Sequence, residues 1–155
     1  SFPEYMDYIA SRRYSLDIGA QIAHGSLRYY VMGERGRMNE EATPDDLRQM
    51  SQLVTEAVQA GALGFSTSRT IGHRALDGSP VPGTFAPDQE LSAIADAMAR
   101  AGRGVFEMVF EIIDRPGVLK LFQAEDFVAF ACFNMNGIFM GLFCSSNKMG
   151  NFVQA

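Results

Sequence analysis

A run of polar side chains between residues 66 and 74 holds the groups of this chain that could do chemistry. A guanidinium group can bind a carboxylate through two parallel hydrogen bonds, and hydroxyl groups can line a cleft for a small polar molecule. The run therefore predicts a binding site for a small carboxylate. Its candidate substrate-binding residues are Ser66, Thr67, Arg69, His73 and Arg74.

Each kind of side chain in this run also has a purely structural interpretation. Hydroxyls that follow a strand often hydrogen-bond nearby backbone groups, and we weigh that interpretation equally with a substrate cleft. A solvated basic loop is the interpretation that we favour for Arg69, His73 and Arg74. A nucleophilic serine is not predicted, because the chain contains no Gly-x-Ser-x-Gly sequence.

His24 and Glu107 are two further candidates. A zinc site needs three or four ligands, and His73 is the only other histidine in the sequence. We therefore favour for His24 a hydrogen bond to a neighbouring loop. Glu107 lies among apolar residues, where we expect a structural ion pair with an arginine rather than a general acid or base.

A short apolar strand is expected directly before the polar run. Ala62 to Phe65 is apolar and follows Gly61, a residue suited to end a helix in the left-handed conformation. In parallel α/β proteins, ligands bind at the carboxyl ends of the strands. The polar run is therefore expected in a loop at the ligand-binding edge of a sheet.

The clearest helix signal precedes that strand. Thr43 can cap a helix, Pro44 suits the first helical position, and two aspartates follow, which favour the positive end of the helix dipole. Apolar residues then recur at helical spacing as far as Ala60. The sequence thus predicts a helix over residues 44–60.

The other expected elements are less strongly marked: helices over 2–13, 27–32 and 87–100, strands over 17–23 and 104–110, and loops over 34–42 and 75–84. Ser26 is the expected N-cap of the helix over 27–32, and Gly33 its end. Crossover helices force parallel strand pairing. The expected fold class is therefore α/β with consecutive βαβ units, an order that fits an open sheet and a closed barrel equally.

Charge and cysteine content limit the classes of function. The formal net charge is −5 and the pI is near 5.0, so electrostatics give no argument for nucleic-acid binding. Cys132 and Cys144 lie far apart and lack metal or redox spacing, which favours reduced thiols in a cytoplasmic protein. No charged-then-apolar leader follows Ser1, so no signal peptide is predicted.

Residues 111–155 form a tail rich in phenylalanine and methionine. Between Phe127 and Cys144 the apolar run approaches the length of a membrane span, but asparagine and glycine residues interrupt it, so no membrane association is expected. A buried helix pair remains one interpretation. A segment foreign to the preceding fold, such as out-of-frame coding sequence, is another.

Several segments of the first 110 residues resemble the N-acyl-D-amino-acid deacylase group of the amidohydrolase superfamily (amidohydrolase family 3). They occur in the same order as in that family. The segments are 17–33, 61–70, His73-Arg74, Asp77-Gly78, 81–86 and Glu90-Leu91.

The resemblance implies part of a TIM-like (β/α)8 barrel from a zinc-dependent hydrolase that cleaves amide C–N bonds, such as those of N-acyl-D-amino acids. A whole barrel needs about 250 residues, so residues 1–110 would form a partial barrel and residues 111–155 a tail of unclear origin. The family's metal-binding histidine near the end of the third strand would fall around residues 107–111, where this sequence has none. We expect a fragment that supplies substrate-side loops, binds no metal and is inactive alone.

A second hypothesis belongs to a different functional class. The chain could be a non-catalytic α/β module that binds a small carboxylate or a partner chain through the loop from Ser66 to Arg74. Both hypotheses predict a binding site in the same loop, and they differ in whether this site serves a hydrolase.

Overall fold

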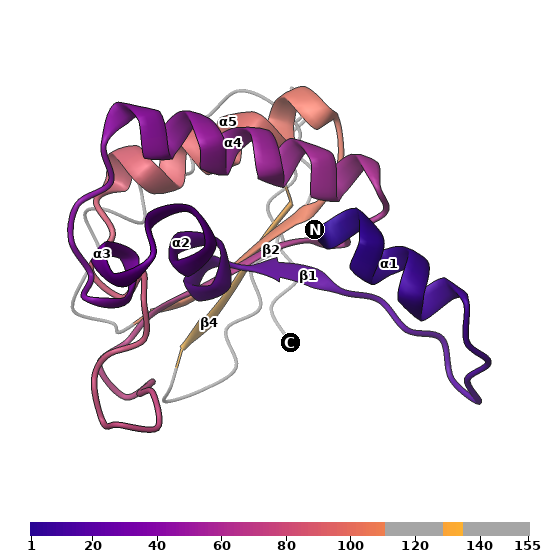
Figure 1. The fold of residues 1–155 in the computed structure, drawn as a ribbon, viewed down its shortest axis with the longest axis horizontal. Helices are drawn as coiled ribbons and strands as arrows, with labels where there is room; N and C mark the ends of the chain where they lie inside the picture. Colours follow the sequence, from indigo (N-terminus) through magenta and orange to yellow (C-terminus); the bar gives the residue numbers. More distant parts are fainter. Residues whose placement is uncertain (111–128, 135–155) are drawn as a thin grey trace, which may run out of the picture.

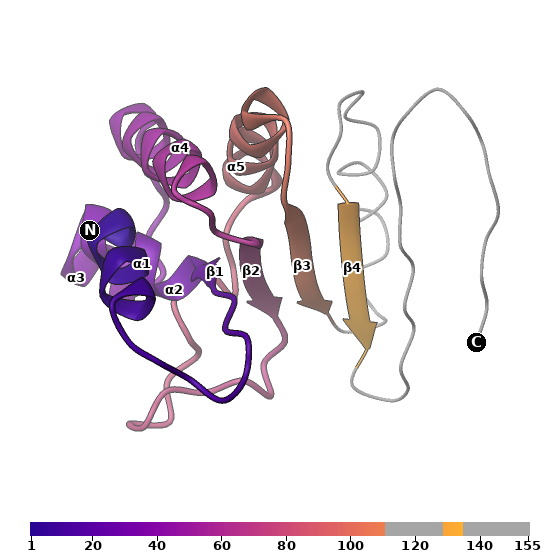
Figure 2. The same cartoon turned by 90° about the vertical axis from the view of Figure 1, so that its right-hand side faces the viewer.

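The computed structural model describes residues 1–110 and 129–134, which form an α/β fold around a four-stranded parallel sheet. The strands are β1 (Gln21–Ala23), β2 (Gly64–Arg69), β3 (Val105–Phe110) and β4 (Ala129–Asn134). They lie side by side in chain order, and every neighbouring pair is parallel (Figure 2). The predicted α/β class and parallel pairing are confirmed, and closure of the sheet into a barrel stays a prediction.

Helices connect β1 to β2 and β2 to β3, and they pack against the sheet. The helices of the described residues are α1 (Phe2–Ala10), α2 (His24–Met32), α3 (Glu34–Arg37), α4 (Pro44–Gln59) and α5 (Asp88–Ala101). Helices α4 and α5 pack side by side against one face of the sheet (Figure 1). None of the helices in the described part of the chain is long and apolar enough to cross a membrane.

The core lies between this helix pair and the sheet. One apolar stripe on each helix faces the buried phenylalanines of β2 and β3, whose rings lie 5.0 Å apart. Burial of each large apolar side chain is worth about 1.5–3 kcal/mol, so this layer stabilises the packing of the helix pair on the sheet. The fully buried residues of the layer include Met50, Val54, Val58, Phe65, Leu91, Ile94, Met98 and Phe106.

The predicted helix over residues 44–60 is confirmed as α4, with both of its end signals. Thr43 accepts a hydrogen bond from the Asp46 amide, and Asp46 accepts one from the Thr43 amide, a reciprocal capping box. Gly61 follows with a φ of 106°, which favours glycine. Local chemistry therefore determines where this helix begins and ends.

Three local predictions need correction. The polar residues Ser66 to Arg69 belong to β2 rather than to a loop, because the parallel ladder with β3 continues to the pair Arg69 and Phe110. Ser26 is not an N-cap, since α2 begins at His24 and its N-cap is Ala23. The predicted loop over 34–42 contains α3.

Other boundaries shift without changing the architecture. Helix α1 is three residues shorter than predicted, and β1 keeps the last three residues of the strand expected over 17–23. Residues 11–19 are exposed, so no burial favours a longer strand there. In the tail, the described residues 129–134 form a strand rather than part of a helix pair. The rest of the tail, including Cys144, lies outside the described residues.

Candidate functional site

The carboxyl ends of β1, β2 and β3 border a cavity of about 470 Å³. Helix α2 starts directly where β1 ends, so its first turn forms one wall, and the loop after β2 folds back to form another. The lining residues are Ala23, His24, Gly25, Ser26, Tyr29, Ser66, Thr67, Ser68, His73, Val81, Pro82 and Val109. The cavity thus occupies the position where parallel α/β proteins bind ligands.

The predicted substrate-binding residues divide into two groups. Ser66, Thr67 and His73 line the cavity. Arg69 donates a hydrogen bond to the Ala86 carbonyl and lies 4.0 Å from the Asp88 carboxylate, while Arg74 donates to the Gly78 carbonyl. The two arginines are therefore not among the cavity-lining residues, and a role for them in binding carboxylate stays a prediction.

His24 joins the cavity wall to the interior. It is 2% exposed, and its Nδ1 lies 2.7 Å from the Thr67 hydroxyl. Its Nε2 lies 2.7 Å from the Glu90 carboxylate at the start of α5. The ring is also stacked at a tilt on Phe65, with 5.2 Å between centroids. A structural hydrogen-bonding role is thus observed for His24, with partners on a strand and a helix rather than on a loop.

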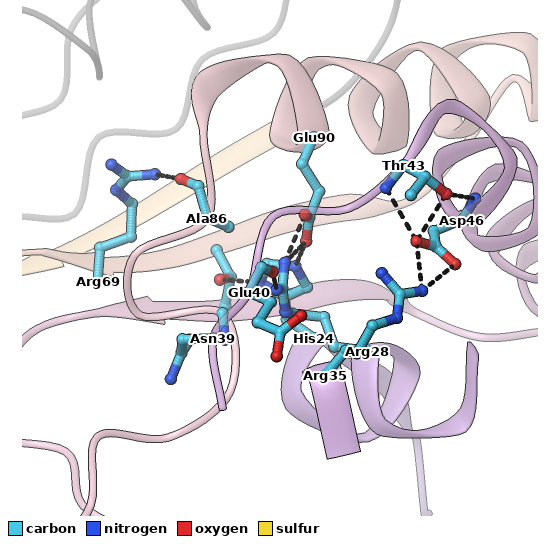
Figure 3. Close-up of polar contacts among 12 residues, drawn as sticks. His24, Arg28, Arg35, Asn39, Glu40, Thr43, Asp46, Arg69, Ala86 and Glu90 are labelled. Carbon is cyan, nitrogen blue, oxygen red and sulfur yellow. Dashed lines mark hydrogen bonds and ion pairs between the residues drawn. The ribbon is translucent and has the colours of Figure 1, made fainter. Parts of the chain in front are cut away.

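Arg28 and Glu90 form a buried ion pair behind His24 (Figure 3). Each side chain is 1% exposed. Arg28 Nη1 donates to both Glu90 oxygens, at 2.6 and 2.5 Å, and Nη2 donates to the Glu40 carbonyl. Such a pair is costly to bury but more costly to break, because one charge would remain without its partner.

Burial and neighbouring charges set the protonation of these groups. Burial lowers the pKa of His24 below its ordinary value, and although Glu90 opposes this, Arg28 and Arg69 add to it. Burial alone would raise the pKa of Glu90, but the hydrogen bonds from His24 and Arg28 outweigh it, so this pKa is lowered. At neutral pH the pair is therefore a neutral imidazole and an ionised carboxylate.

The order hydroxyl, imidazole, carboxylate also occurs in nucleophilic hydrolases, where the imidazole accepts the hydroxyl proton. Here the imidazolium that would result is disfavoured, because burial and the neighbouring guanidinium groups lower the pKa of His24. The negative charge of Glu90 is already balanced by the guanidinium group of Arg28. The arrangement is therefore suited to holding Thr67 in one orientation rather than to removing its proton.

The loop after β2 closes on His24 and leaves no spare room. A Cβ added at Gly83 would lie 2.4 Å from His24 Nδ1. Asn39 holds this part of the loop: its side chain accepts from the Gly83 amide at 2.8 Å and donates to the Pro80 and Val81 carbonyls. The imidazole is thus confined by backbone as well as by hydrogen bonds.

The chemistry of this site does not fit a metal ion. Both His24 nitrogens are occupied by Thr67 and Glu90, and Glu90 is bound through both oxygens by Arg28. Within residues 1–110 and 129–134, no three histidine, cysteine or acidic side chains are grouped as a metal site would require. The expectation that this chain binds no metal stays a prediction.

Sequence reasoning missed the acid of the site. It assigned a structural ion pair to Glu107, but Glu107 is half-buried and forms no ion pair with the described arginines, whereas Glu90 does. In the sequence, Glu90 stands out only as part of the segment Glu90-Leu91 that resembles the deacylase group. The available signal was Arg28, a charged residue among the apolar residues of α2.

The structure of this chain is similar to part of the structures of known deacylating enzymes. No protein-family model matches it, and no curated protein matches it in sequence. Its structure is similar to a copper-bound D366A mutant of D-aminoacylase, with a TM-score of 0.63, 19% identity and 87% of this chain covered. It is also similar to N-acyl-D-glutamate deacylase from Bordetella bronchiseptica, with a TM-score of 0.66, 20% identity and 88% covered.

In both cases the chain spans 28% of the other protein. The D-aminoacylase is described as having a binuclear metal centre and as defining a subset of amidohydrolases. The deacylase structure holds zinc and a phosphonate that mimics the tetrahedral intermediate of its reaction. The resemblance read from the sequence motifs is thereby confirmed at the level of the fold.

Proposed function

We propose that this chain is a segment of an amidohydrolase of the N-acyl-D-amino-acid deacylase group and that it supplies the substrate side of the active site. The observation that carries the proposal is the cavity at the carboxyl ends of β1, β2 and β3. It lies in a fold similar to part of two deacylating enzymes. The reaction of the whole enzyme would be hydrolysis of an amide C–N bond.

The residues of this chain would bind and orient the substrate. Ser66, Ser68 and His73 bring hydroxyls and an imidazole to the cavity, groups that can hydrogen-bond a carboxylate or an acyl oxygen. Zinc would supply the activated water in the whole enzyme, but the residues described here do not fit it. We therefore propose that the chain alone binds substrate without turning it over.

A direct binding measurement tests this proposal. Titration of the 155-residue chain with N-acetyl-D-glutamate, followed by NMR, should shift the resonances of Ser66, Thr67 and His73. The double variant Ser66→Ala/His73→Ala should bind at least about tenfold more weakly, because two hydrogen bonds are lost. Binding that leaves this cavity unperturbed would contradict the proposal. Turnover with stoichiometric zinc would contradict the inactivity of the chain alone.

The second candidate is a non-catalytic module for a small carboxylate. It is favoured by the polar groups of Ser66, Ser68 and His73, which suit a carboxylate whether or not an amide is attached. Glutarate has the two carboxylates of N-acetyl-D-glutamate without its amide and therefore separates the two functions. Equal affinity for glutarate would favour the module, whereas a clear preference for N-acetyl-D-glutamate would favour the deacylase segment.

A further inference from the structure

We propose that Thr67 selects ligands by hydrogen-bond polarity: its hydroxyl gives its one proton to His24 and offers the cavity only acceptor lone pairs, which select an N–H donor. In the proposed function that donor would be the amide N–H of an N-acyl amino acid, so the inference rests on that function and deepens it. His24, Arg28 and Glu90 act through Thr67 and are positioning residues.

The chain of donors and acceptors starts at Arg28. A guanidinium group only donates hydrogen bonds, and Arg28 donates to both oxygens of Glu90. Glu90 is therefore held as a carboxylate, which only accepts. The contact of 2.7 Å between Glu90 and His24 Nε2 then requires a proton on Nε2.

The proton on Nε2 decides the polarity of the other nitrogen. A neutral imidazole carries one proton, so Nδ1 is left as an acceptor. Burial at 2% exposure disfavours a second proton on His24. The contact of 2.7 Å between Nδ1 and Thr67 Oγ1 is therefore a hydrogen bond donated by Thr67.

Thr67 differs from its neighbours Ser66 and Ser68 because its hydroxyl is bound to a buried histidine. Among the described residues, its oxygen has one hydrogen-bond partner, His24, and Thr67 itself lines the cavity. Its proton cannot turn toward a ligand without breaking the bond to His24. The Gly83 backbone packs next to the same nitrogen, since a Cβ added there would lie 2.4 Å from Nδ1, and Glu90 holds Nε2 on the far side of the ring. A ligand atom that meets Thr67 Oγ1 must therefore donate.

The first test needs neither a ligand nor a variant. Long-range ¹H–¹⁵N correlation NMR of the histidine rings in the 155-residue chain at pH 7 reports which nitrogen carries the proton. We expect His24 to be protonated at Nε2 alone. Protonation at Nδ1, alone or together with Nε2, would overturn the inference whatever the chain binds.

The second test compares two probes that differ in one atom. N-acetyl-D-glutamate carries the amide N–H, and its ester analogue (R)-2-acetoxyglutarate carries an oxygen in that place. We expect the amide to bind roughly tenfold or more tightly, because the ester would leave a buried acceptor unpaired. Thr67→Val should abolish this preference, whereas Ser66→Ala should weaken both probes and keep the ratio.

The outcomes separate the inference from the proposed function. Equal binding of the two probes, or a preference that survives Thr67→Val, would overturn the inference and leave the proposed function standing. No binding of either probe would overturn both. Circular dichroism establishes that Thr67→Val is folded, and a failure to fold leaves the ring tautomer and the wild-type preference as the deciding measurements.

Discussion

Two buried carboxylates among residues 1–110 and 129–134 carry arginine partners, and they differ in surroundings. Glu90 and Arg28 are both 1% exposed, and they join α5 to α2 behind the cavity. Asp46 is likewise buried, but Arg35 is 42% exposed, and Asp46 also caps its own helix. One pair connects distant parts of the chain where water has no access, while the other closes a helix end at the surface. Removing one partner should therefore cost very different amounts.

The largest effect is expected for Glu90→Gln. The variant leaves Arg28 buried beside a neutral amide, which typically costs about 3–5 kcal/mol. Urea denaturation followed by circular dichroism should show a loss of this order in the free energy of unfolding. The matched control is Asp88→Asn, two residues earlier in the same helix and less buried. Equal losses in the two variants would show that burial of the pair is not decisive.

Gly83→Ala should have the next largest effect, because the added methyl group would collide with the buried His24 ring, which hydrogen-bonds Glu90. Gly78 provides the comparison, since both glycines have positive φ, 96° and 82°, but a Cβ at Gly78 meets nothing within 4 Å. Gly78→Ala should cost only the left-handed backbone term of about 1–2 kcal/mol. Gly83→Ala should cost clearly more and shift the His24 ring resonances. Equal thermal stabilities of the two variants would contradict the close packing at His24.

Asp46→Asn should cost about 1–2 kcal/mol, since it weakens a capping box and removes one ion pair. Arg35→Ala removes the ion pair alone and should cost less than about 1 kcal/mol, because the pair is open to solvent. The free energies of unfolding of the two variants, measured at low and at high salt, separate the contribution of the ion pair from that of the cap. A loss in Arg35→Ala as large as that in Asp46→Asn would mean that the ion pair, not the cap, holds this helix end.

The smallest effect at neutral pH is expected from His24. Its pKa in the folded state lies below the ordinary value of 6.5, so below that pH the unfolded chain binds a proton that the folded chain does not. Stability should therefore fall as the pH drops from 7 toward 5. The lowered pKa of Glu90 adds a further loss only below about 4.5. Unfolding free energies measured between pH 8 and 5 should show the first decline, also in the control variant His73→Gln.

The same two pairs show how far sequence reasoning reaches. Thr43, Pro44 and Asp46 lie within four residues of one another, so local rules predict both the cap and the helix. Arg28 and Glu90 are 62 residues apart, and no local pattern connects them. Glu107 also lies in an apolar stretch of sequence, yet its side chain is half-buried, whereas that of Glu90 is fully buried. Apolar periodicity predicts which elements form, but partners across the fold depend on how those elements pack.

The candidate site was predicted in part for the same reason. The position of the polar run after an apolar strand indicated the edge of the sheet, and Ser66, Thr67 and His73 do line the cavity there. Their spacing could not reveal that Ser66 to Arg69 extend β2, since the ladder with β3 depends on a strand about forty residues later. Nor could it place Arg69 and Arg74, whose guanidinium groups bond to backbone carbonyls.

The strand order β1-β2-β3-β4 has a consequence for how the chain acquires its structure. Each strand pairs with the one before it, and successive partners begin only about forty residues apart in the first two pairs. None of the four described strands must wait for a later segment to be inserted beside it, so each pairing closes a segment of about forty residues or fewer. Synthesis from the amino terminus would then let each new strand and helix dock on an already ordered neighbour while the ribosome is still translating.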